Sequence, residues 1–450
     1  STSGTSNFAA GVNAGNSIAS GGNYNTVIGD EAGTAITTSV KNTLVGSQAG
    51  DGITSGDGLN VAIGYDALSA GSNTTQENVA IGVEALNSED GHGRNVAVGY
   101  QALKTQNAGA LARNTAVGHL AGTAVTTGIE NTLIGANAGT NLTDADRNTA
   151  VGYQALTTDT QGSKSTAIGY NALSVQNFSS ATDSLNTAVG FEAGENVTTG
   201  IQNVLIGALA GDAFTDADFN VAIGYNALTG DTKGSRSVAI GRGALAVQNF
   251  SSATNAFNTA VGYGAGVAVT TGIKNNLFGG NAGLALTDAD YNVAVGHSAL
   301  ATDTQGSRSV AIGYQALTTQ NFTSATDSYN TAVGYDTGKA ITTATQNTLI
   351  GYAAGDGIVT GSGNTALGYV ALSGAVDDGV YNTCVGAAAG LVTTGDQNTF
   401  VGAYDPSTGG SGAEITSGSK NTILGAYNGN QDSLDIRTSS NRIVLSDGDG

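Results

Sequence analysis

A five-residue motif, Asn-x-[Ala/Leu]-[Val/Ile]-Gly, returns about every 17 residues along almost the whole chain. It reads NTVIG at 25–29, NTLVG at 42–46 and NVAIG at 60–64, and it is still present as NTILG at 421–425. We refer to this motif as the repeat tag. A repeat this short, with about 24 copies in 450 residues, predicts a solenoid in which each copy is one coil of the backbone.

The spacing of the tags has a longer period. Most tags follow the previous one after 17 residues, but in the middle of the chain every fourth step is 21 residues long. The segments TDADRNTAVGYQAL at 143–156 and TDADFNVAIGYNAL at 215–228 are 72 residues apart, so four coils form one super-repeat. We therefore expect three regions, namely an N-terminal cap and first coil at 1–24, a regular roll at 25–402, and irregular C-terminal coils at 403–450.

Charge and composition exclude two classes of partner. The formal net charge is −20, and the chain has no basic stripe of the kind that a nucleic-acid groove needs. No apolar run reaches the roughly 18 residues of a membrane helix. We expect neither nucleic-acid binding nor membrane insertion. Cys384 is the single cysteine, so a disulfide within the chain is impossible.

The alternation of side chains around each tag is typical of a strand. In NTAVG at 148–152, Ala150 and Val151 point to opposite sides. We expect the β-branched residue before each tag glycine to form an apolar column inside the coil. A coil of seventeen residues can hold two strands of five or six residues with two turns, or it can form a triangle of three very short sides. Because each coil carries only one tag, we favour the flat, two-sided form. The predicted fold is an all-β, parallel β-roll or β-solenoid of about 24 coils of 17–21 residues.

Two positions in nearly every coil carry small residues. Alanine is frequent in the middle of the tag, as at Ala62, and three residues after the tag glycine, as at Ala67. We interpret these columns as places where another backbone comes close, because only small side chains fit there. A thin roll buries little apolar area to offset the entropy of ordering it. We therefore expect the chain to be its own partner, most simply in a homotrimer about an axis.

The first tag residue predicts a structural ladder of side-chain amides. Asparagine at a coil corner tolerates left-handed backbone and hydrogen-bonds the next coil. Serine replaces it at Ser165, Ser237 and Ser309. The predicted ladder begins with Asn25, Asn42, Asn60, Asn78, Asn95, Asn114, Asn131 and Asn148.

The tags resemble repeats of known fibres. The stretches SVAIG at 237–241 and 309–313 are similar to the head repeats of YadA-like trimeric autotransporter adhesins, a resemblance that covers roughly residues 7–425 and implies a left-handed, trimeric parallel β-roll. The segment NTAVGYQAL at 148–156 is more similar to the repeats of phage tail fibres. The segment SSNRIVLSDGDG at 439–450 resembles the region upstream of their self-cleaving intramolecular chaperone.

The resemblance implies a function in attachment. We expect the shaft or head of an extracellular fibre in a virion tail, with a host cell-surface glycan or protein as its partner. The alternative is a bacterial surface adhesin or extracellular filament. A remote alternative is a polysaccharide-degrading solenoid enzyme. Such an enzyme needs two carboxylates about 5–9.5 Å apart in a cleft, and the short turns here do not favour one, so no catalytic residue is predicted.

Paired acids in the turns are a candidate for weak calcium binding. Calcium takes six to eight oxygen ligands, and a DxD turn with carbonyl groups supplies several of them. The alternative is an Asx-type turn with solvated carboxylates. No other cofactor is expected. The pairs are Asp144 and Asp146, Asp216 and Asp218, and Asp288 and Asp290.

The 21-residue coils carry the candidate recognition residues. Each inserts a segment such as VQNFSSATDSLN at 175–186. Its phenylalanine recurs as Phe178, Phe250 and Phe322. We hypothesise that these rings form an exposed ridge that contacts a receptor or glycan. The alternative is that each ring folds back over its own loop.

Overall fold

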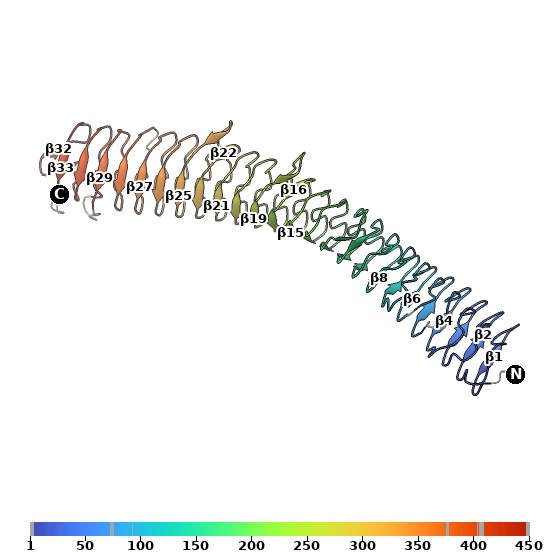
Figure 1. Cartoon of the computed structure of the whole chain (residues 1–450). Coiled ribbons are helices and arrows are strands. Elements are labelled where there is room, and N and C mark those ends of the chain that lie inside the picture. Colours follow the sequence, from blue (N-terminus) through green and yellow to red (C-terminus); the bar gives the residue numbers. More distant parts are fainter. Residues whose placement is uncertain are drawn as a thin grey trace. The chain divides into compact units, whose positions relative to one another are not determined.

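The computed structural model describes residues 4–72, 76–91, 93–374, 378–402, 404 and 409–446. Over these residues the chain is an all-β parallel solenoid of about 25 turns, and they form no helix (Figure 1). This confirms the predicted all-β parallel solenoid. The chain divides into two compact units, Ser1–Ala222 and Ile223–Gly450, at a point inside the predicted regular region 25–402.

In the first unit each tag contributes one strand of three residues to a parallel ladder. The strands of successive coils lie side by side, as β2, β4, β6 and β8 show in Figure 1. The pairing is in register, since Thr149 faces Thr166 and Ala150 faces Ala167. The strands are β1 (Phe8–Ala10), β2 (Thr26–Ile28), β3 (Thr43–Val45), β4 (Val61–Ile63), β5 (Val79–Ile81), β6 (Val96–Val98), β7 (Thr115–Val117), β8 (Thr132–Ile134), β9 (Thr149–Val151), β11 (Thr166–Ile168), β13 (Thr187–Val189) and β14 (Val204–Ile206), and β15 (Val221–Ile223) falls at the division between the units.

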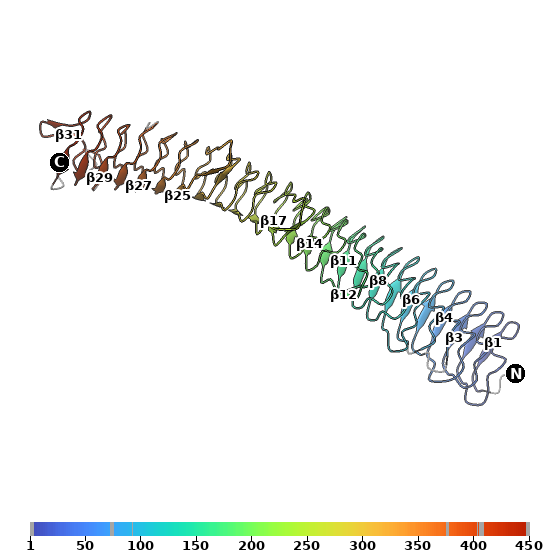
Figure 2. The same cartoon turned by 45° about the horizontal axis from the view of Figure 1, so that its top comes forward.

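The second unit repeats this arrangement, with β25, β27 and β29 stacked in the same manner (Figure 2). Its register is equally strict, and Ala332 of one coil faces Leu349 of the next. The strands are β17 (Val238–Ile240), β19 (Thr259–Val261), β20 (Asn276–Phe278), β21 (Val293–Val295), β23 (Val310–Ile312), β25 (Thr331–Val333), β26 (Thr348–Ile350), β27 (Thr365–Leu367), β28 (Thr383–Val385), β29 (Thr399–Val401), β30 (Thr422–Leu424) and β33 (Ile443–Leu445).

The 21-residue coils add short strand pairs to the main ladder. In each case two residues of the inserted segment pair in parallel with the coil before it. One antiparallel pair lies near the C-terminus. These strands are β10 (Gly162–Ser163) with β12 (Thr182–Asp183), β16 (Gly234–Ser235) with β18 (Thr254–Asn255), β22 (Gly306–Ser307) with β24 (Thr326–Asp327), and β31 (Asn430–Gln431) with β32 (Leu434–Asp435).

The coil is not the flat two-sided form that we predicted, because it has one three-residue strand and a series of tight corners. In one typical coil the backbone is left-handed at Arg147 (φ 58°), Gln154 (φ 55°) and Leu156 (φ 53°). Such backbone is unfavourable for residues other than glycine. Hydrogen bonds between coils hold these corners, as Leu156 N donates to Ala172 O at 3.0 Å.

The side of the strand that faces inward is the reverse of our prediction. The middle residue of each strand is buried, as Ala62 is fully, whereas Ile63 before the tag glycine is 37% exposed. The middle residue is most often alanine or leucine, and Val27, Phe400 and Ile423 take the same buried position in their coils. Cys384 takes this middle position in β28 and is buried, and burial raises the pKa of its thiol to about 12. The β-branched residues therefore form a column on the outer face.

The columns of small residues also have a different cause from the one we inferred. Ala67, three residues after a tag glycine, is fully buried inside its own chain. A Cβ added at Gly122 would lie 2.6 Å from the Leu133 side chain of the next coil. Alanine and glycine thus make room for leucines of neighbouring coils within one chain, and they give no evidence for a second chain.

Candidate functional site

The predicted asparagines form a continuous hydrogen-bonded ladder at the start of the strands. Asn131 is buried, its Oδ1 accepts from the backbone N of Asn148 at 2.9 Å, and its Nδ2 donates to Ala145 O at 2.8 Å. Where serine interrupts the column, Ser165 N still donates to Asn148 Oδ1 at 2.8 Å. The same link joins Asn25, Asn42, Asn60, Asn78, Asn95, Asn114 and Asn131 in order.

In each acidic pair of the turns, the second carboxylate accepts from a backbone amide and the first accepts from the hydroxyl group of the preceding threonine. Asp146 Oδ1 accepts from Ile129 N at 2.9 Å, and Asp144 Oδ1 accepts from Thr143 Oγ1 at 3.1 Å. The second acids of the other pairs, Asp218 and Asp290, accept from the preceding coil in the same way. Asp216 and Asp288 accept from the adjacent threonine. Among the described residues there is no group of three or more His, Cys, Asp or Glu side chains arranged to hold a metal ion.

The phenylalanines of the long coils are not an exposed ridge, which corrects our prediction. Phe178, Phe250 and Phe322 are each only 6% exposed. A Cβ added at Gly162 would lie 2.8 Å from the Phe178 ring, so the ring covers the glycine turn of the preceding coil. Their side chains are therefore packed against the preceding coil and are not available to a receptor.

Sequence reasoning missed the buried carboxylates beneath these rings. Asp159 is fully buried, and its Oδ1 accepts from Gly162 N and Phe178 N at 3.0 and 3.1 Å. Its Oδ2 accepts from Gln176 Nε2 at 2.5 Å. Asp231 and Asp303 repeat this arrangement, and burial raises the pKa of Asp231. The 72-residue recurrence of Asp and Gln was the signal that could have revealed these nodes.

Glu89 occupies the corresponding turn of an earlier coil. Its side chain is fully buried and accepts from Gly91 N at 2.9 Å and from Asn95 Nδ2 at 3.1 Å. Burial, with a smaller contribution from the charge of Asp90, raises the pKa of this carboxyl group to about 7. The hydrogen bonds from Gly91 and Asn95 oppose that shift. Glu89 is therefore a group that changes charge near neutral pH.

The outer face of the main strands is the most extended surface feature. The third residue of each strand points outward, and together these residues form a column that is apolar in every described strand of the main sheet. The column includes Ile134 (39% exposed), Ile168 (37%) and Leu367 (43%). The first-position column is mostly threonine or valine and carries no charge in those strands. An uncharged, half-exposed face is unusual for a chain with a net charge of −20.

An aromatic ladder follows this face at the position after the tag glycine. In the first unit the ring centroids of Tyr153 and Tyr170 lie 5.5 Å apart, and those of Tyr170 and Phe191 lie 5.3 Å apart, with the planes nearly parallel. In the second unit a longer ladder has centroid spacings of 5.0–5.7 Å. It consists of His297, Tyr314, Tyr335, Tyr352 and Tyr369. These rings are exposed on the single chain.

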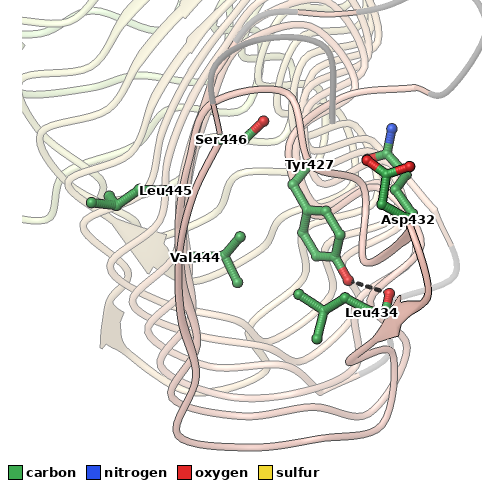
Figure 3. A pocket seen from close by; sticks show the side chains of 7 residues that line it. Tyr427, Asp432, Leu434, Val444, Leu445 and Ser446 are labelled. Atoms are coloured by element: carbon green, nitrogen blue, oxygen red, sulfur yellow. Dashed lines mark hydrogen bonds between the residues drawn. The ribbon is translucent and has the colours of Figure 1, made fainter.

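A pocket of about 390 Å³ lies near the C-terminus (Figure 3). Tyr427 and Leu434 face it from one side and Val444 from the other, and Tyr427 Oη donates to Leu434 O at 2.6 Å. Its remaining lining residues are Gln431, Asp432, Leu445 and Ser446. The end of the predicted region before a chaperone, residues 447–450, lies outside the described residues.

Comparison with family models and with curated proteins finds no match to this chain. In the part of the chain that the structure describes, no helix has the length and apolar character needed to cross a bilayer. The candidate site therefore has to be judged on its own geometry. The uncharged outer face and the aromatic ladder beside it are its two components.

Proposed function

We propose that the chain is the shaft or head of an extracellular fibre of three parallel copies, each a left-handed roll. We place it in a phage tail that attaches to a host cell-surface glycan or protein. The observation that supports assembly is the outer apolar column, which includes Ile134 and Ile168 and continues through the described strands of each unit. Burying such a column against a partner is favourable because it removes apolar area from water.

The period of the column favours another copy of the chain as the partner. Strands of the main sheet follow one another at about 4.8 Å, so a partner that covers the column must present side chains at the same rise. A parallel copy in register meets this requirement coil by coil. About 25 coils, each with a side chain exposed by about a third, give an area comparable to the roughly 800 Å² per partner of stable interfaces.

The decisive measurement is the mass of the chain in solution. One chain is 44.2 kDa, and light scattering after size exclusion should give about three times that value. Replacing Ile134 and Ile168 with lysine puts unpaired charges into the interface and should raise the dissociation constant at least about tenfold. The matched control places the same two charges at the exposed Asn107 and Asn141 and should leave the mass unchanged. A wild-type chain that stays monomeric at tens of micromolar would refute the assembly.

The full reading frame tests the biological setting. A tail fibre should carry a virion-attachment domain upstream and a cleavable chaperone downstream. A bacterial adhesin of the same architecture should instead carry a stalk and a membrane anchor. The second result would leave the assembly intact and overturn the assignment to a virion.

A further inference from the structure

The aromatic ladder is interrupted at three positions that are 72 residues apart. The position after the tag glycine, which carries a ring in neighbouring coils, is Ala136, Ala208 and Gly280 in turn, whereas it is Tyr352 one super-repeat later. Ala136 lies between the coils of His119 and Tyr153, and Gly280 between those of Tyr263 and His297. Each break therefore has an aromatic side chain one coil before it and one coil after it.

The rings beside the breaks are already stacked on their far sides. His119 stacks on Tyr100 with centroids 5.3 Å apart, and Tyr153 stacks on Tyr170. The opposite face of each of these rings is turned toward the break. Tyr263, beside the Gly280 break, is 60% exposed, and Tyr153, beside the Ala136 break, is 45% exposed, so both rings are open to solvent.

Arg242 shows what fits between two rings that are two coils apart. It occupies the same position after a tag glycine, and its guanidinium carbon lies 5.7 Å from the Tyr225 ring centroid and 5.6 Å from that of Tyr263. Its Nη1 also donates to Tyr263 Oη at 3.1 Å. A planar cation is thus held between two faces of the ladder by cation–π attraction. The breaks at Ala136 and Gly280 also have a ring on either side, in each case one tyrosine and one histidine, but they lack the central side chain.

We propose that the breaks at Ala136 and Gly280 are slots for the guanidinium group of an arginine on a partner protein. The group is flat enough to enter between two rings, as Arg242 does, and the negative ring faces attract it. An ammonium group lacks this planarity and is more strongly hydrated. The slot is narrow at its base, since a Cβ at Gly280 would lie 3.4 Å from Cδ2 of His297. The net charge of −20 favours a cationic partner in the same way.

Saturation-transfer NMR with N-acetyl-arginine amide tests this proposal on the chain in whatever assembly it forms. N-acetyl-lysine amide is the matched control ligand. We expect saturable binding with at least about a threefold preference for arginine, which is a modest part of what contact with two rings supplies. Absence of saturable binding, or equal binding of the two ligands, would overturn the proposal.

Two sets of variants locate the binding. Ala136→Arg, Ala208→Arg and Gly280→Arg together put an arginine at all three breaks and should abolish the preference for arginine. Arg242→Gly opens a further slot and should increase the arginine signal over wild type. Circular dichroism and light scattering on each variant separate a filled slot from a lost fold or a lost assembly. A filled variant that is folded, assembled as wild type and still prefers arginine would overturn the proposal.

Discussion

The tag glycine is the residue that the coil can least replace. Gly152 has φ 139°, a conformation that other residues rarely adopt. A Cβ at this position would lie 2.3 Å from Gly169 O of the next coil. The requirement for glycine thus comes both from the backbone conformation and from the close approach of the neighbouring coil.

We predict that Gly152→Ala lowers the free energy of unfolding by at least about 2 kcal/mol, from left-handed strain and the clash together. Gly280→Ala is the control, because its added Cβ would be in ordinary contact at 3.4 Å from the His297 ring and its φ is not in the left-handed region. Urea denaturation followed by circular dichroism measures both. An equal loss of unfolding free energy in the two variants would show that the strain and the clash at Gly152 do not limit stability.

Glu89 makes the stability of its coil depend on pH. Its pKa in the folded chain is about 7, above the ordinary value of 4.5. Between these values the folded state keeps a proton that the unfolded state releases, so stability falls as the pH rises through this window. Above pH 7 the loss of unfolding free energy is complete and amounts to about 3 kcal/mol.

We predict that Glu89→Gln removes this dependence. The variant should gain stability relative to wild type between pH 5 and pH 8, because the buried group no longer ionises. Urea denaturation of both proteins at several pH values measures the difference, and the other acids cancel in the comparison. A difference that stays constant from pH 5 to pH 8 would show that Glu89 does not titrate in this window.

At the scale of the element, the asparagine ladder is the link that fixes each coil to the next. Asn131 satisfies the backbone N of Asn148 and the backbone O of Ala145 in an interior that water does not reach. An unsatisfied buried polar group costs about 1–3 kcal/mol. The ladder therefore contributes to stability at every coil where it is continuous.

We predict that Asn131→Ala destabilises the chain by about 2–5 kcal/mol, since it leaves two buried backbone groups without these partners. Asn141→Ala, at an exposed turn position of the same coil, is the control and should cost less than about 0.5 kcal/mol. Hydrogen exchange of the Asn148 amide gives a local measure, and it should accelerate only in the first variant. Unchanged exchange of that amide would contradict the role of the ladder.

The strand itself shows where sequence reasoning reached its limit. The alternation of Ala150 and Val151 correctly placed the two side chains on opposite faces, because a strand has a period of two. It did not tell which face is inside. We chose the more hydrophobic residue for the interior, but the middle residue of each strand points inward, and it is most often alanine or leucine.

At the scale of the whole molecule, the folding of one chain is distinct from the assembly that we propose. The alanine columns lie inside the chain, so the interior of each coil is filled by side chains of the same chain. The apolar column on the outer face, by contrast, would be covered only in the proposed assembly.

We predict that the Ile134→Lys and Ile168→Lys double variant keeps its fold when it dissociates. Far-UV circular dichroism of the dissociated chain should match that of wild type, while its thermal midpoint falls because assembly no longer stabilises it. Loss of β-structure on dissociation would show instead that the coils need their neighbours to fold.

The repeat in the sequence determined the solenoid, the parallel register and the asparagine ladder, because a fixed period in the chain becomes a fixed rise between coils. It also located the acidic turns and the super-repeat. Only the tertiary structure decided that the valine and isoleucine column faces outward, that Phe178 is buried over Asp159, and that Arg242 lies between two tyrosine rings. These features depend on where corners of left-handed backbone turn the coil, and the repeat period does not specify those corners.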